Sequence, residues 1–169
     1  MGAFVYPRSE PGSGGHLDLV ERLNAVAPAL RREVDGLPEA VLTYRPAEGE
    51  WSIHEICGHL CDAAYFLHTR LFRMITQEEP RLPAYDQEAL ARARNAQEAR
   101  IDDLLAEFSA QQAETVEMLA DLVHWNWART GRHEELGRIS IRQLVDRAVA
   151  HDENHLAQVR ALKAKAEKR

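Results

Sequence analysis

The stretch that decides the fold is residues 140–165, SIRQLVDRAVAHDENHLAQVRALKAK, because it combines a complete helical pattern with a pair of histidines. Ser140 is followed three residues later by Gln143, the spacing of a capping box that begins an α-helix. The last turns are rich in lysine, which suits the negative end of a helix dipole. The apolar residues recur at helical spacing along one face: Ile141, Leu144, Val145, Ala148, Leu156, Val159 and Leu162. We therefore predict a helix from Ser140 to about Lys165.

Three further long amphipathic helices are predicted upstream of this segment. The second of them begins at another capping box, formed by Ser52 and Glu55. The loops between the helices contain proline, glycine and tryptophan but no convincing strand alternation, so we expect no β-structure. The predicted long helices cover residues 16–34, 52–76 and 98–122, and a short helix covers residues 87–94.

Four long amphipathic helices predict an all-α fold, a four-helix bundle. The chain of 169 residues has the length of one domain, which we place at residues 16–169. Residues 1–15 are rich in proline, glycine and serine and are expected to form a flexible leader. The two long connectors leave room for a topology other than simple up-down-up-down.

Composition excludes several classes of function. The formal net charge is -6, and no basic stripe is present, so nucleic acid is not an expected partner. No apolar run reaches the roughly 20 residues that span a bilayer, and no secretory signal is recognisable. The two cysteines, Cys57 and Cys61, lie four residues apart in one helix, which argues against a disulfide framework. We expect a cytoplasmic protein.

Three of the eight histidines fall on inward faces and are candidate metal ligands. His151 and His155 lie about 40° apart on the helix, on the side that also carries Leu144 and Val159. His59 lies at one border of the apolar stripe of the 52–76 helix. Three neutral imidazoles and a water form a familiar catalytic metal site, so we predict a divalent metal near the flank of the bundle. The remaining histidines are assigned ordinary packing or surface roles: His16, His54, His68, His124 and His133.

The sequence HDENH is not the zincin motif HExxH, because its second position is Asp152 instead of glutamate. Asp152 lies about 100° from His151 around the helix, so we expect it to point away from the metal. The spacing of the histidines is therefore expected to matter more than the residues between them.

Neighbouring residues receive more limited roles. Cys57 and Cys61 lie about 160° from His59 and are expected to pack, not to bind metal. Glu55 is assigned to the helix cap, although it could also orient His59. Gln158 follows His155 by three residues and is a candidate for orienting substrate or water. No catalytic role is assigned to the tryptophans: Trp51, Trp125 and Trp127.

Two segments together resemble DinB-like (YfiT-like) proteins. EWSIHEICGHLCDA (50–63) resembles the second-helix signature of that family, and LGRISIRQLVDRAVAHDENHLAQVRAL (136–162) resembles its last-helix signature. The resemblance implies a four-helix bundle with an unusual order of helix directions, often a homodimer. It also implies a divalent metal, most often zinc or nickel, on three histidines that match His59, His151 and His155.

Characterised members of the family join low-molecular-weight thiols to electrophiles, and one is a thiol-dependent maleylpyruvate isomerase. The resemblance therefore predicts a metal-dependent thiol S-transferase whose partners are a small thiol and an electrophile. Coordination would hold the thiol as a thiolate at neutral pH. Two alternatives use the same ligands: a hydrolase that activates water, and a non-enzymatic metal- or ligand-binding bundle with a stress-related role.

Overall fold

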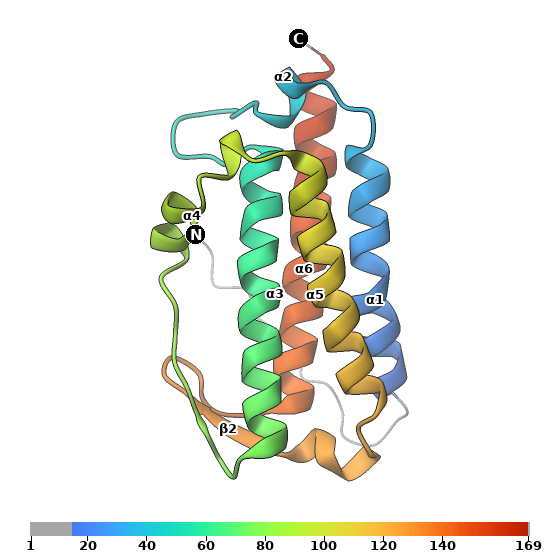
Figure 1. The fold of residues 1–169 in the computed structure, drawn as a ribbon, viewed down its shortest axis with the longest axis vertical. Helices are drawn as coiled ribbons and strands as arrows, with labels where there is room; N and C mark the ends of the chain where they lie inside the picture. The colour runs from blue at the N-terminus through green and yellow to red at the C-terminus, as the bar shows by residue number, and fades with distance from the viewer. Residues whose placement is uncertain (1–14, 169) are drawn as a thin grey trace.

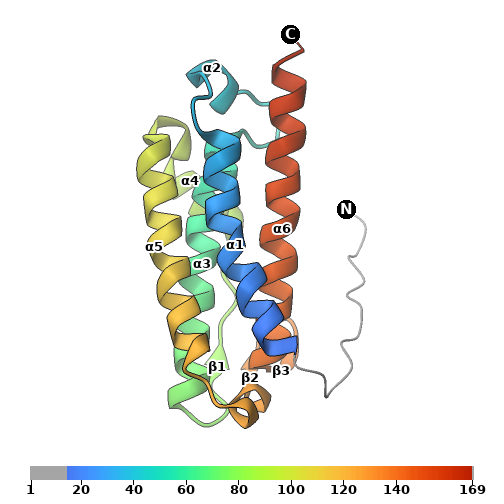
Figure 2. The same cartoon turned by 90° about the vertical axis from the view of Figure 1, so that its right-hand side faces the viewer.

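The computed structural model describes residues 15–168, and four long helices form its body (Figure 1). They are α1 (Gly15–Val34), α3 (Ile53–Thr76), α5 (Ile101–Ala120) and α6 (Ile141–Ala166). Helices α1 and α6 run in one direction, and α3 and α5 run in the other (Figures 1 and 2). Each helix packs against two others, α1 and α3 both contacting α5 and α6. The four-helix bundle is confirmed, and the leader predicted for residues 1–15 falls, apart from Gly15 in α1, outside the described residues.

The neighbours α3 and α5 are parallel, so the chain between them must travel back along the bundle. This crossover contains β1 (Arg81–Leu82), α4 (Gln87–Arg94) and the 3₁₀ turn η1 (Ala96–Glu98), and it runs along the outer side of α3 (Figure 1). Both α4 and η1 contact α3. The other connections are shorter excursions at the ends of the bundle, with α2 (Glu39–Leu42) at one end and η2 (His124–Ala128) at the other.

The expectation of no β-structure was wrong. Strands β2 (Thr130–His133) and β3 (Gly137–Ser140) form an antiparallel pair, and β1 joins β2 in parallel, with Leu82 opposite His133. Each strand has only two to four residues, too few to show alternation in the sequence. Gly137, at φ +71°, adopts a left-handed conformation at the start of β3. The sheet ties the crossover to the connection between α5 and α6.

Both predicted capping boxes are present and set where α3 and α6 begin. The side chains of Ser52 and Ser140 accept hydrogen bonds from the backbone N–H groups of Glu55 and Gln143, whose side chains bond back to the serine N–H groups. The helices expected at 52–76, 87–94 and 140–165 therefore match α3, α4 and α6. Helix α5 is shorter than the 98–122 expected, because residues 96–98 form a separate 3₁₀ turn.

The core consists of two apolar clusters with a polar layer between them. One cluster contains Leu60, Phe108 and Val159, and the other contains Leu71 and Leu119. The buried polar side chains between the clusters come from α5 and α6: Gln112, Thr115 and Asp152. Within the described residues, no helix has the length and apolarity to cross a membrane.

The two cysteines belong to the first apolar cluster, as predicted. Both are buried free thiols, and the Cys61 Sγ donates to the Leu104 carbonyl at 3.2 Å. Burial raises the pKa of both thiols to about 12. These cysteines are therefore packing residues that stay protonated.

Gly58 sets how closely the crossover can approach α3, and this closeness is testable. A Cβ at Gly58 would lie 2.7 Å from the Cβ of Ala96 and 2.8 Å from the Cδ of Arg94. Alanine gains about 1 kcal/mol of helix propensity over glycine, but overpacking costs about 1–3 kcal/mol. We expect Gly58→Ala to lower the free energy of unfolding by about 1 kcal/mol in urea titrations.

The matched background is Ala96→Gly, which removes the nearer of the two atoms that a Cβ at Gly58 would strike. In that background the same change at Gly58 should cost less, because only the Arg94 side chain still has to move. Equal effects of Gly58→Ala in both backgrounds would contradict the close packing of η1 on α3.

Candidate metal centre

The structure brings together the three histidines that the sequence singled out. His59 comes from α3, while His151 and His155 come from successive turns of α6. One ring nitrogen of each lies within 4.8 Å of the others, and this is the one such group of potential ligands within residues 15–168. His59 is 2% exposed, and the other two rings are half-buried. The cluster therefore sits inside the contact between two antiparallel helices, with access from the side of α6.

Hydrogen bonds fix which nitrogen of each α6 ring can bind a metal. The Nδ1 of His151 lies 2.9 Å from Asp152 Oδ1, and the Nδ1 of His155 lies 2.9 Å from Gln158 Oε1. Since an ionised carboxylate and an amide oxygen only accept hydrogen bonds, both Nδ1 atoms carry the proton. Both Nε2 atoms then keep a lone pair for a metal.

The spacing of the nitrogens fits a tetrahedral metal. Zinc–nitrogen bonds of about 2.0–2.1 Å place two ligand nitrogens about 3.3 Å apart. The Nε2 atoms of His59 and His151 are 2.8 Å apart, and no pair in the group exceeds 4.8 Å. At this distance a neutral His59 can donate its Nε2–H to the Nε2 of His151, and a bound metal would take the place of that proton. Small side-chain adjustments would let all three imidazoles bind one divalent ion.

The rings are held in the neutral form that metals require. Burial, with the neighbouring imidazoles as the next cause, lowers the pKa of His59 to about 3. Burial and His151 lower the pKa of His155 to about 4. Both rings are therefore unprotonated at neutral pH, and no proton competes strongly with a metal there.

Asp152 has a role that the sequence reading missed. We expected Asp152 to point away from the metal, but its carboxylate accepts a hydrogen bond from the Nδ1 of the ligand His151. Asp152 is 5% exposed, and its Oδ2 accepts from Gln112 Nε2 of α5 at 2.8 Å. It also lies four residues from both Ala148 and Leu156, so an acid within the apolar stripe was the overlooked signal. The residues between the histidines thus matter more than we expected.

The other residues considered from the sequence, Gln158, Glu55 and Trp51, have different roles around the site. Gln158 is exposed and accepts a hydrogen bond from His155, and its role toward a substrate stays a prediction. Glu55 serves the helix cap, as expected, and also pairs with Arg45. Trp51, to which no role was assigned, packs its ring 4.9 Å from His59 and 6.3 Å from His155, centre to centre. It forms one wall of the site.

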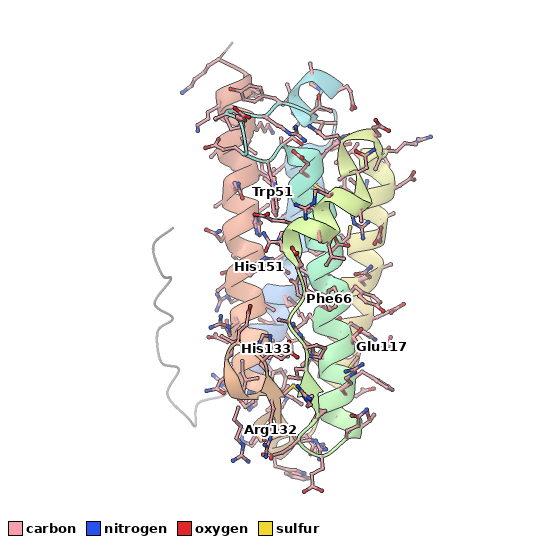
Figure 3. All side chains as sticks on the ribbon, turned by 90° about the vertical axis from the view of Figure 1, so that its left-hand side faces the viewer. Trp51, Phe66, Glu117, Arg132, His133 and His151 are labelled. Carbon is pink, nitrogen blue, oxygen red and sulfur yellow. The ribbon has the colours of Figure 1, made fainter. Side chains whose placement is uncertain are left out.

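Two hollows flank the cluster. One has a volume of about 260 Å³ and is lined by His151 and Asp152. The other has a volume of about 980 Å³ and is lined by His155 and Trp51. Gln87, in α4, lines both. Figure 3 shows Trp51 and His151 one after the other along this side of the bundle. A metal on these histidines could therefore be approached by two molecules.

The hydrogen bond from His151 to Asp152 should set metal affinity. Asp152→Asn keeps the shape but loses the charge that fixes the ring, and such changes weaken metal binding about 10- to 100-fold. We expect this loss for zinc, measured by competition with a chromophoric chelator. The control is Glu153→Gln, which changes the next residue, an acid paired with Arg22. Equal zinc affinities for the two variants would show that Asp152 does not contribute to metal binding.

The depressed pKa values of His59 and His155 predict how the metal-free protein responds to acid. Below about pH 6.5 these two histidines bind protons in the unfolded chain but stay neutral in the folded protein. The free energy of unfolding therefore falls as the pH drops toward 4. The loss should exceed about 1.4 kcal/mol, the equivalent of one pKa unit. Urea titrations at several pH values measure it. His59→Gln should flatten the slope, and an unchanged slope would show that His59 is not held neutral.

Comparison with known proteins assigns this sequence to a family. The sequence profile of the DinB superfamily matches residues 22–159. Two proteins of Oceanobacillus iheyensis, each provisionally named a metal-dependent hydrolase, are similar to this chain. One is 23% identical over 141 residues, covering 83% of this chain and 81% of the relative. The other is 29% identical over 114 residues, covering 68% and 66% respectively.

Solved structures share the fold. YfiT from Bacillus subtilis, described as "a probable metal-dependent hydrolase with an unusual four-helix bundle topology", superposes with a TM-score of 0.88 at 20% identity, covering 95% of this chain and 93% of YfiT. TT2238, described as a four-helix bundle protein, superposes with a TM-score of 0.64 at 21% identity, covering 86% of this chain and 98% of TT2238. Because the superfamily profile spans most of the sequence, this chain belongs to the DinB superfamily.

Proposed function

We propose that the protein is a metal-dependent thiol S-transferase that joins a small thiol to an electrophile at His59, His151 and His155. One observation carries the choice: His151 lines one hollow and His155 lines the other, so a metal bound by these two rings and His59 would have open space on two sides. A transfer reaction must bring two molecules together at one point, whereas hydrolysis needs room for one molecule and a water. The two-sided access therefore favours transfer.

The protein's own residues prepare the site for this reaction. Asp152 and Gln158 hold the α6 rings with Nε2 free, and Trp51 shields one side of His59. Three neutral ligands would leave a divalent ion its full charge, which favours the deprotonated form of a bound thiol. Gln87 lines both hollows and offers an amide to a molecule in either.

The thiol must come from a separate molecule. Cys57 and Cys61 are buried in the apolar cluster, and their pKa values are raised to about 12. A thiol in that state is neither accessible nor ionised, so it cannot act as the nucleophile. This supports a small thiol as the first substrate.

A metal-dependent hydrolase is the second candidate, favoured by the names of the two Oceanobacillus relatives. The same three imidazoles could hold an ion that lowers the pKa of a bound water. Three further points stay predictions. The family resemblance suggests a homodimer and a site for zinc or nickel, and the cysteine usage suggests a cytoplasmic location.

Metal content and turnover test the proposal in sequence. Protein purified without a His-tag should contain about one zinc or nickel per chain by elemental analysis, and His155→Ala should lose most of it. His68→Ala is the matched control, because His68 contacts Thr115 in the polar layer and lies outside the cluster. Unchanged metal content in His155→Ala would remove the basis of the proposed site.

The loaded protein should then conjugate a bacterial thiol to monochlorobimane, with His155→Ala at least 100-fold slower. Bacillithiol, mycothiol, glutathione and coenzyme A are the thiols to compare. Ester hydrolysis without any thiol conjugation would favour the hydrolase instead. A metal that raises the melting temperature while neither reaction occurs would favour a non-enzymatic bundle.

A further inference from the structure

The hollow beside His151 contains an arginine that forms no ion pair with a carboxylate of the described residues. Arg70 of α3 lines this hollow and is partly buried. Its Nη2 donates to the Pro83 carbonyl at 2.7 Å, and its Nε is buried without an acceptor. Within residues 15–168, Arg70 forms no ion pair, and burial is the main cause that lowers its pKa. Leaving a cation in this state is costly, so a function for the charge is expected.

Arg94 is a useful comparison, because it is an arginine of the same bundle with a structural role. It is also partly buried, and its guanidinium meets Asp62 at 2.6 Å and Glu107 at 2.9 Å. Those two carboxylates tie α4 to α3 and α5. Arg70 has no such pair, so its guanidinium is left for a molecule that enters the hollow.

Aromatic rings hold Arg70 in place without neutralising it. Its guanidinium carbon lies 5.2 Å from the centre of the Tyr85 ring and 5.9 Å from that of Phe66. The two rings stack on each other with centres 4.1 Å apart. Cation–π contacts of this kind orient the guanidinium, and its remaining donors stay available.

His133 supplies a second donor in the same hollow. Its Nδ1 accepts hydrogen bonds from the backbone N–H groups of Glu135 at 3.2 Å and Leu136 at 3.4 Å. The proton of the neutral ring is therefore on Nε2, which makes that atom a donor. Burial and the charge of Arg70 lower the pKa of His133, so this neutral form dominates at pH 7. Figure 3 shows His133 on the same side of the bundle as His151.

The acidic groups of the hollow do not cancel these donors. Both oxygens of Asp152 are occupied, one by His151 and the other by Gln112. Glu135 is exposed at the rim. Arg147 also lines the hollow, so two arginines offset the two carboxylates. A divalent ion on the histidines would make the hollow positive overall.

We propose that this hollow, defined by Arg70, His133 and His151, is a carboxylate-recognition subsite. The substrate that enters beside His151 would be a small molecule carrying a carboxylate, which Arg70 pairs with and His133 hydrogen-bonds. The link to a thiol or an electrophile rests on the proposed function, but recognition of the carboxylate requires only the hollow.

Succinate and its diamide, succinamide, test the subsite by NMR on zinc-loaded, ¹⁵N-labelled protein. Succinate should shift the Arg70 Nε–H resonance and bind at least tenfold more tightly than succinamide. Arg70→Leu should abolish this preference at unchanged zinc content. Arg73→Leu is the matched control, because Arg73 lies one turn further along α3 and does not line the hollow. Arg70→Lys should retain part of the preference.

Equal binding of succinate and succinamide by the wild-type protein would overturn the subsite, as would no binding of either. These two outcomes are measured on the wild-type protein alone, so they do not depend on whether a variant folds. Equal succinate affinity in Arg70→Leu and Arg73→Leu would also overturn it, because the zinc alone would then explain the binding.

Thiol conjugation separates this inference from the proposed function. Mercaptosuccinate and 2-mercaptoethanol are compared as thiols for monochlorobimane. Succinate recognition through Arg70 without conjugation of any thiol would support the subsite and reject the transferase. Conjugation of both thiols without recognition of succinate would support the transferase and reject the subsite.

Discussion

The buried carboxylate of Asp152 is the interaction on which the arrangement of the site depends. It joins Gln112 of α5 to His151 of α6, two helices that lie diagonally across the bundle and share few direct contacts. A carboxylate buried to this extent must be hydrogen-bonded, and removing one partner costs about 1–3 kcal/mol or more. The polar layer between the two apolar clusters therefore has a specific geometry, and that geometry points the Nε2 of His151 toward His59. Apolar packing alone would not select one ring orientation.

The helix directions determine what surrounds the three imidazoles. Because α3 and α5 are parallel neighbours, the chain needs a crossover, and this crossover passes along the outer side of α3 (Figure 1). Gly58, directly before His59, lets η1 approach α3 closely. Gln87 of α4 then reaches both hollows, and the pairing of β1 with β2 carries His133 to the hollow beside His151. The walls of the site are thus a consequence of the topology.

Local patterns predicted the parts of the structure that depend on one helix at a time. Capping boxes and apolar spacing located α3 and α6, and helical geometry placed His151 and His155 on one face. The missed features depend on contacts between distant segments. The sheet pairs residues about 50 positions apart through strands too short to leave a pattern. The partner of Asp152, Gln112, lies 40 positions away on another helix, so no local rule could name it.

The acid–base groups near the cluster add to the case for thiol transfer. The two least exposed carboxylates of the hollows, Asp152 and Glu55, are both committed, the first to His151 and Gln112, the second to Arg45 and the cap at Ser52. Neither is free to take a proton from water or to return one to a leaving group. Free thiols have a pKa of about 8.5 and water one of about 15.7, so a thiol needs far less help to ionise. Displacement of a halide by a thiolate also needs no proton donor. With its two least exposed carboxylates committed elsewhere, the proposed site is better matched to a thiol than to water.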